Sequence, residues 1–156
     1  MIALTHREIS PGEGHETGRS LLAELYLAHR GTELPDVVLE DRGKPRFVED
    51  PLQFSITHTR HHVFVAISDH PIGIDAEELD RKIDLRLADK ILSPTEKQQF
   101  DAAPDKRLAL LTLWVLKEAD GKRTGQGING YPNKTNFSLN DPRVQTLNGC
   151  LVAVIE

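Results

Sequence analysis

The chain has 156 residues, of which 38% are hydrophobic, and its 24 acidic and 19 basic residues give a formal net charge of −5. This length is that of one ordinary domain with a sizeable core, so we expect residues 1–156 to form a single domain. The excess of acidic residues disfavours nucleic-acid binding. The longest nearly apolar run, residues 108–116, is too short to cross a membrane. The single cysteine excludes an intrachain disulfide. Since the charged first residues do not resemble a signal peptide, we expect a cytoplasmic protein.

The first half of the chain is expected to form one helix followed by strands. Residues 17–29 carry leucines at helical spacing before Gly31, which predicts a helix that ends there. Short runs of β-branched and aromatic residues then predict strands at 36–40, 53–57, 62–68 and 72–77. The short turns between the last three strands indicate antiparallel neighbours.

The second half is expected to form two helices and then two strands. Ser93-Pro94-Thr95-Glu96 has the pattern of a capping box and predicts a short helix through Phe100. A long helix is predicted at 106–124, and strands at 135–139 and 150–155. The order of helix, strands, helices and strands predicts an α+β fold with a mostly antiparallel sheet.

Three carboxylates are candidates for a metal site. Side chains alternate along a strand, so Asp75 and Glu77 share one face, where their charges repel unless a hard divalent cation neutralises them. Glu118 lies at the edge of the apolar stripe of the long helix, four residues before Lys122. Taken alone, Asp75 and Glu77 are better explained as a solvated strand end, and Glu118 with Lys122 as a surface ion pair worth about 0.2–0.5 kcal/mol.

Two other segments are candidates for binding an anion. Thr57 and His58 end an apolar strand and are suited to donate hydrogen bonds to a phosphate, whereas His61 and His62 are expected in an exposed turn rather than in a metal site. Gly43-Lys44-Pro45-Arg46 places two cations on a proline-fixed turn, although a solvated basic turn fits these residues equally well.

The order of these motifs resembles that of the 4'-phosphopantetheinyl transferase superfamily, in particular its monomeric branch, which activates synthetases and fatty-acid carrier proteins. The resemblance runs from about Gly18 to Ile128. It is carried by Gly43-Lys44-Pro45, Phe54-Ser55-Ile56-Thr57-His58-Thr59, Ile72-Gly73-Ile74-Asp75-Ala76-Glu77, and Trp114-Val115-Leu116-Lys117-Glu118-Ala119 followed by Lys122 and Gly125-Gln126-Gly127-Ile128. Two departures are the hydroxyl pair Thr57 and Thr59, where serines are usual, and Gly121, where a bulkier residue is usual.

The resemblance implies a fold of two similar halves, each a small antiparallel sheet with a packed helix, and an active site in the cleft between them. It implies a monomer that transfers phosphopantetheine from coenzyme A to a serine of an acyl or peptidyl carrier protein and releases 3',5'-ADP. Two alternatives stay open. One is a Mg²⁺-dependent phosphoesterase or nuclease that uses the same carboxylates, and the other is a module that binds coenzyme A or a carrier protein without catalysis.

The resemblance also implies a role for each candidate residue. Asp75, Glu77 and Glu118 would bind Mg²⁺, or alternatively Mn²⁺, and the catalytic residues would be Glu118, Lys122, Asp75 and His58. The coenzyme would be bound by Lys44, Thr57, His58, Lys117, Lys122, Arg19 and Ser20. Because family members usually have a longer N-terminal segment, Arg7 is the remaining candidate for the 3'-phosphate, and weaker coenzyme binding is expected.

Overall fold

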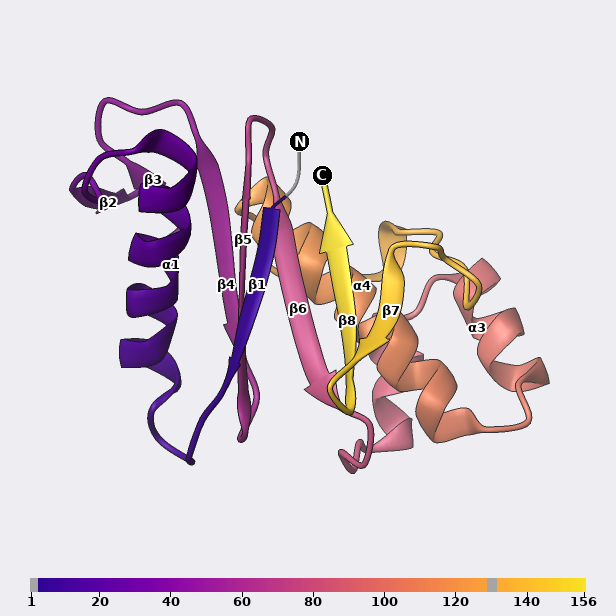
Figure 1. The fold of residues 1–156 in the computed structure, drawn as a ribbon. Helices are drawn as coiled ribbons and strands as arrows, with labels where there is room; N and C mark the ends of the chain where they lie inside the picture. The colour runs from indigo at the N-terminus through magenta and orange to yellow at the C-terminus, as the bar shows by residue number, and fades with distance from the viewer. Residues whose placement is uncertain (1–2, 129–131) are drawn as a thin grey trace.

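A computed structural model describes residues 3–128 and 132–156 and confirms the α+β class (Figure 1). The helices of this part are α1 (Gly14–Arg30), α2 (Ala88–Ile91), α3 (Pro94–Ala102) and α4 (Lys106–Thr124), with short 3₁₀ turns η1 (Leu85–Leu87) and η2 (Pro132–Lys134). The strands are β1 (Ala3–Glu8), β2 (Val37–Leu39), β3 (Pro45–Phe47), β4 (Gln53–His58), β5 (His62–Ser68), β6 (Gly73–Glu78), β7 (Val144–Leu147) and β8 (Cys150–Ile155). They form three antiparallel sheets with the strand orders β1-β5-β4, β2-β3 and β6-β8-β7.

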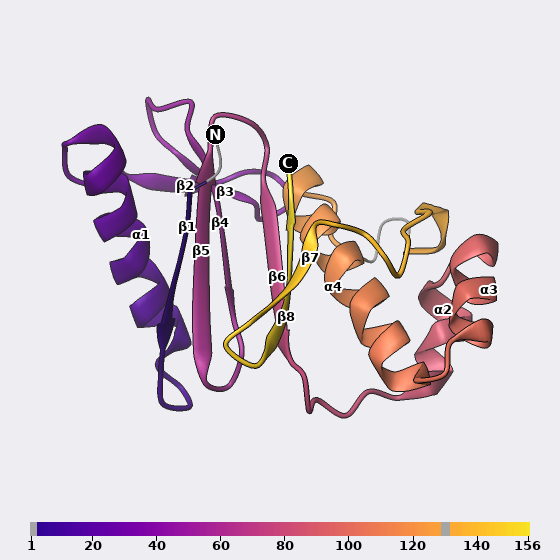
Figure 2. The same cartoon turned by 45° about the vertical axis from the view of Figure 1, so that its right-hand side comes forward.

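The two larger sheets lie between the two long helices, with α1 on one side and α4 on the other (Figures 1 and 2). The alternation along β5 shows how this arrangement is built. Val63, Val65 and Ile67 pack in the cluster that contains the apolar side chains of α1. The intervening Phe64 and Ala66 pack instead with residues of β6 and β8. Strand β5 is therefore buried on both faces, which explains its nearly continuous apolar sequence.

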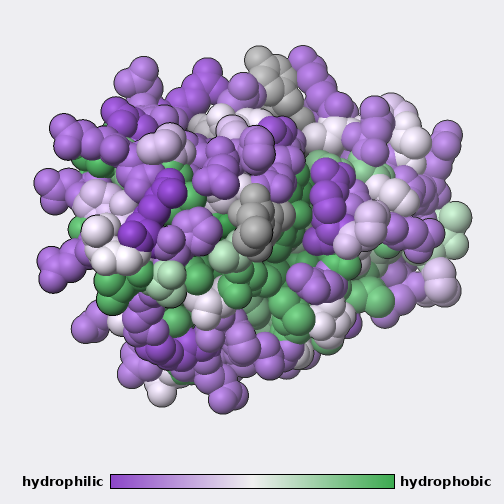
Figure 3. All heavy atoms as spheres, turned by 45° about the horizontal axis from the view of Figure 1, so that its top comes forward, coloured by the Kyte–Doolittle hydropathy of each residue, from purple (hydrophilic) through white to green (hydrophobic). Residues whose placement is uncertain are grey.

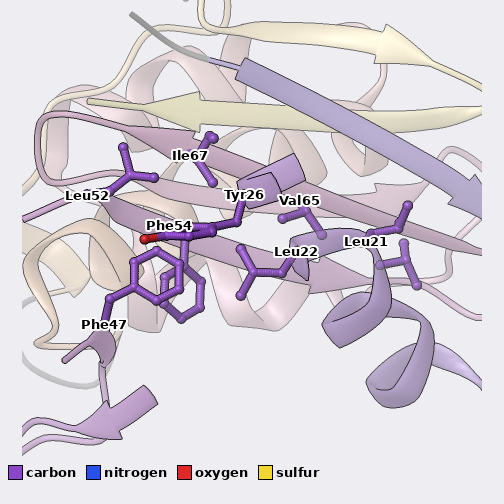
Figure 4. Close-up of a cluster of buried hydrophobic side chains, with 9 residues drawn as sticks. Leu21, Leu22, Tyr26, Phe47, Leu52, Phe54, Val65 and Ile67 are labelled. Atoms are coloured by element: carbon purple, nitrogen blue, oxygen red, sulfur yellow. The ribbon is translucent and has the colours of Figure 1, made fainter. Parts of the chain in front are cut away.

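The small hairpin of β2 and β3 is attached to the first sheet by an aromatic side chain. Phe47 is 1% exposed, and its ring centroid lies 4.6 Å from that of Phe54 and 5.0 Å from that of Tyr26 (Figure 4). Since Phe47 closes β3, its burial fixes the turn at the other end of the strand, which carries Lys44.

Helix α4 packs so closely on β6 that no side chain fits between their backbones at Gly73. A Cβ atom at Gly73 would overlap the carbonyl oxygen of Ala119 and lie 2.5 Å from the backbone nitrogen of Arg123. Only glycine therefore permits this approach. The close packing brings the outward face of β6, with Asp75, directly against the last turns of α4.

The expectation of a strand at 135–139 is wrong. The backbone nitrogen of Phe137 donates to Glu96 and that of Leu139 donates to Gln99, so side chains of α3 provide the acceptors that a neighbouring strand would have provided. Strand β8 pairs instead with β6 and β7, and it is joined to β7 through Asn148 and Gly149, which have positive φ angles of 51° and 74°. Strands β1, β3 and β7 were not predicted.

Hydrophilic residues cover most of the face drawn in Figure 3, with a band of hydrophobic residues across its lower part. Among the large apolar side chains that remain exposed in the described residues is Leu39 of β2, at 71%. None of the helices in the described ranges combines the length and the apolar composition that a membrane span requires.

Candidate functional site

A cavity of about 300 Å³ lies between the turn that leads into β3, strand β4 and helix α4, and a second cavity of about 350 Å³ lies between β4, β6 and α4. They share Ile56, Glu118 and Lys122 in their walls, and we call them together the Asp75 groove. The predicted site residues that line this groove are Lys44, Thr57, His58, Asp75, Glu77, Glu118 and Lys122. The fold thus gathers in one place residues that are widely separated in the sequence.

Asp75 is the most buried carboxylate of the groove, with its side chain 9% exposed. Its Oδ1 accepts hydrogen bonds from Lys122 Nζ at 2.8 Å and from Thr57 Oγ1 at 3.2 Å. Its Oδ2 is also buried and has no hydrogen-bond partner among the described residues. Burial raises the pKa of Asp75, although Lys122 opposes this shift. The site therefore contains a buried acceptor oxygen that remains available to a ligand.

Glu118 is half-buried on α4 and interacts electrostatically with Asp75. Burial is the main cause that raises the pKa of Glu118, and the negative charge of Asp75 adds to it, while Lys122 and Arg81 act in the opposite direction. A raised pKa makes a carboxylate a better proton acceptor near neutral pH than an ordinary glutamate.

Glu77 lies at the groove but forms an ion pair with Arg81, whose guanidinium group lies 5.7 Å from the centre of the Trp114 ring. In the described ranges, no three histidine, cysteine, aspartate or glutamate side chains are grouped closely enough to hold a metal ion. The donor chemistry nevertheless fits a hard divalent cation, because carboxylate oxygens line the groove and Asp75 Oδ2 is unpaired. Joint binding of one cation by Asp75, Glu77 and Glu118 requires these carboxylates to come closer together than they lie in this structure.

Two lysines approach the groove from different elements. Lys122 Nζ donates to Asp75 and, at 3.0 Å, to the backbone oxygen of Ile74. Lys44 Nζ donates to the backbone oxygen of Arg123 near the end of α4, and burial lowers the pKa of Lys44. Both ammonium groups are therefore held by acceptors of β6 or α4 while they line the groove.

Thr57 and His58 reach the groove from the end of β4. Thr57 is buried against Asp75, whereas His58 is exposed. The His58 ring is packed against the first turn of α1, since a Cβ atom at Gly14 would lie 2.5 Å from its Cγ. This contact fixes the histidine at the mouth of the groove.

Three of the predicted coenzyme ligands do not line the Asp75 groove. Arg19 and Ser20 are exposed on α1, where Ser20 donates to Glu24. Lys117 is buried in an ion pair with Glu96. Arg7, expected at the 3'-phosphate, forms an exposed ion pair with Glu24.

Ser55, Arg81 and Trp114 line the groove but were not expected from the sequence to be site residues. Ser55 Oγ accepts a hydrogen bond from the backbone nitrogen of Ile74, so it joins β4 to β6. The alternation of Phe54 and Ile56 with two hydroxyl residues was the available signal, because it places Ser55 on the same face as Thr57.

The small residue at Gly121 has a structural explanation. A Cβ atom at this position would lie 2.8 Å from the backbone carbon of Gly127. The glycine thus lets the segment after α4 fold back against the helix beside the groove.

Comparison with known proteins identifies the family of the chain. A profile described as "4'-phosphopantetheinyl transferase superfamily" matches residues 71–151, just over half of the chain, and this range contains Asp75, Glu77, Glu118 and Lys122. The chain belongs to the 4'-phosphopantetheinyl transferase superfamily, as its motifs predicted.

Several curated 4'-phosphopantetheinyl transferases are similar in sequence. The chain is 34% identical over 121 residues to psf-1 of Bacillus pumilus, which covers 71% of this chain and 52% of psf-1. It is 32% identical over 124 residues to AcpT of Escherichia coli (strain K12), with coverages of 76% and 63%. It is 30% identical over 138 residues to gsp of Aneurinibacillus migulanus, with coverages of 83% and 56%. The aligned part of the chain thus spans between 52% and 63% of the length of these relatives.

Proposed function

We propose that this chain transfers the 4'-phosphopantetheine group of coenzyme A to a serine hydroxyl of an acyl or peptidyl carrier protein. In this reaction the serine oxygen forms a bond to the phosphorus attached to pantetheine, the pyrophosphate bridge breaks, and 3',5'-ADP leaves. Family membership and the names of the relatives support the proposal. The observation that carries it is the Asp75 groove, where a buried carboxylate with a free oxygen lies together with Glu118 and Lys122.

Asp75, Glu77 and Glu118 are the residues that would hold Mg²⁺, and Mn²⁺ would be accepted by the same oxygens. When bound, such a cation neutralises charge on the pyrophosphate. The support for this assignment is the carboxylate lining and the unpaired Oδ2 of Asp75.

The remaining steps belong to side chains of the chain itself. Lys44, Thr57 and His58 would bind and orient the phosphates, since all three line the groove with hydrogen-bond donors. Glu118 would accept the proton of the serine hydroxyl, a role favoured by its raised pKa. Lys122 would stabilise the charge of the leaving phosphate, and its hydrogen bond to Asp75 holds it in place for this.

The layered fold suggests how the site is assembled. We propose that the two larger sheets, each with one long helix on its outer face, are pseudo-symmetric halves, and that the Asp75 groove belongs to the cleft between them. One chain would then contain the complete site and act as a monomer. The expected cytoplasmic location stays a prediction.

Product analysis tests the proposed function. The protein is incubated with coenzyme A and Mg²⁺, with and without an apo carrier protein, and 3',5'-ADP is quantified by chromatography. A transferase forms 3',5'-ADP only with the carrier and in equal amount to modified carrier. Release of 3',5'-ADP without the carrier would indicate a phosphoesterase, and binding of coenzyme A without any product would indicate a binding module; either result contradicts the proposal.

A further inference from the structure

The most deeply buried charged pair of the described residues lies outside the Asp75 groove. Lys117 Nζ and Glu96 Oε2 are 2.7 Å apart, and the two side chains are 1% and 0% exposed. Burial lowers the pKa of Lys117, while Glu96 acts in the opposite direction. Burying two charges is costly and is tolerated only when their hydrogen bonds are satisfied, so the contacts of this pair indicate its role.

Glu96 joins three separate segments through its two oxygens. Oε2 accepts from the backbone nitrogen of Ser93 at 2.9 Å, which completes the capping box of α3, and it also contacts Lys117 of α4. Oε1 accepts from Thr135 Oγ1 at 2.8 Å and from the backbone nitrogen of Phe137 at 3.0 Å. Lys117 Nζ in turn donates to Thr135 Oγ1, so the lysine and the glutamate hold the same threonine.

This network continues toward the groove through apolar packing. Phe137 and Trp114 pack against the same two clusters of buried residues around α3 and α4. Trp114 also lines the Asp75 groove, as does Glu118, the residue that follows Lys117 in α4. The buried pair thus holds residues 135–137, and Phe137 of this segment packs in the same clusters as Trp114 of the groove wall. Lys117 itself does not line the Asp75 groove.

We propose that Lys117 is a positioning residue and not a phosphate ligand. Together with Glu96 it clamps residues 135–137 against α3 and α4, and it thereby holds Trp114 and Glu118 of α4 in place for the reaction. The catalytic part of this inference rests on the proposed function, and the structural part is tested without it.

Kinetics separate the two roles of Lys117. In Lys117→Met the carboxylate of Glu96 is left buried without its partner, so a positioning role predicts that kcat falls at least about tenfold while the KM for coenzyme A changes less than about threefold. The double variant Lys117→Met/Glu96→Gln removes both charges and keeps an acceptor for Phe137, so it is expected to recover kcat and KM to within about threefold of the wild type. A raised KM for coenzyme A in both variants would overturn the proposal, because a lost phosphate ligand is not restored by a change at Glu96. If Lys117→Met does not fold, the KM and kcat of the double variant alone distinguish a positioning residue from a phosphate ligand.

Hydrogen exchange tests the clamp independently of activity. The amide of Phe137 is expected to exchange at least about tenfold faster in Lys117→Met and in Thr135→Val than in the wild type, because both changes weaken the contacts that close this segment. Lys97→Met removes ion pairs with Asp101 and Asp89 and a cation–π contact with Phe100, but none of the clamp contacts, so it is the control and is expected to leave Phe137 exchange and kinetics unchanged. Unchanged Phe137 exchange in both clamp variants would overturn the clamp. Altered exchange in a protein that transfers no phosphopantetheine would contradict the proposed function but not the clamp.

Discussion

Burial raises the pKa of Asp75 above the ordinary value of 3.8, although the hydrogen bonds from Lys122 and Thr57 act in the opposite direction. A group with a raised pKa in the folded state contributes stability below its unfolded pKa and loses this contribution as the pH rises through the folded value. At neutral pH, which is above the ordinary pKa, and without a divalent cation, the burial of the Asp75 carboxyl group therefore weakens the fold. The buried carboxylate therefore lowers the free energy of unfolding, while its unpaired oxygen stays available to a ligand.

Asp75→Asn is accordingly expected to raise the free energy of unfolding at pH 7 in the absence of divalent cations. The gain should shrink as the pH falls through the folded-state pKa and vanish only well below 3.8, where the carboxyl group is protonated in both the folded and the unfolded protein. Urea denaturation at pH 7 and pH 4 measures both values, and the exposed Asp41→Asn serves as the control. A loss of stability at pH 7 would show that the hydrogen bonds from Lys122 and Thr57 outweigh the cost of burial.

Glu118 is expected to be essential for turnover but not for the fold. Glu118→Gln keeps the size of the side chain and removes its charge and basicity, so transfer should slow at least about 100-fold, the scale of a lost general base. The melting temperature should stay near that of the wild type, because Glu118 is only half-buried. Added Mg²⁺ should restore little of the rate. Steady-state kinetics and thermal unfolding measure both properties, with the exposed Glu16→Gln as the control. A wild-type transfer rate in Glu118→Gln would contradict a catalytic role of Glu118.

The contact between β6 and α4 determines the site at the scale of elements, because it sets the spacing between Asp75 and the two residues of α4 that share its groove. Gly73→Ala forces the helix away from the strand, so we expect a loss of about 1–3 kcal/mol in the free energy of unfolding. Transfer should fall further than the loss of folded protein explains. Gly31→Ala is the matched control, since φ is 75° there but no atom lies within 4 Å, and it should cost only about 1 kcal/mol. Equal effects of the two changes would contradict the close packing.

The sequence predicted best those elements whose pattern reflects their own packing. The bounds of β5, α4 and β8 agree with the expected ranges, because each carries a continuous or periodic apolar pattern. The segment 135–139 alternates apolar residues like a strand, but its backbone bonds to side chains of α3, a tertiary arrangement that local pattern does not contain. Strand β7 had a readable signal that the prediction did not use, since Asn148-Gly149 is typical of a two-residue hairpin turn.

The predictability of the groove residues followed the same principle. Strand alternation placed Asp75 on the face of β6 that the structure turns toward α4, and helical spacing placed Glu118 and Lys122 on one side of that helix. The pairing of Glu77 with Arg81 was not available, because it is formed across the turn after β6, whereas i,i+4 proximity can be read from sequence only within a helix. The burial of Lys117 was not available, because its partner Glu96 belongs to another helix.

At the scale of the whole molecule, one chain brings together the carboxylates of β6 and α4 that line the Asp75 groove. We therefore expect the isolated protein to be a monomer that is active at low concentration. Light scattering coupled to size-exclusion chromatography measures its mass, and the specific activity should not depend on dilution. An obligate trimer whose activity is lost on dilution would contradict this account.

The intact mass of an apo carrier protein tests the central claim most directly. The carrier is incubated with coenzyme A, Mg²⁺ and either the wild-type protein or Glu118→Gln, and its mass is followed over time. The account predicts that the wild-type protein adds one phosphopantetheine group to each carrier molecule and that the variant does so at least about 100-fold more slowly. An unchanged carrier mass with a panel of acyl and peptidyl carriers, or equal rates for both proteins, would contradict the assignment of the Asp75 groove as a phosphopantetheinyl transfer site.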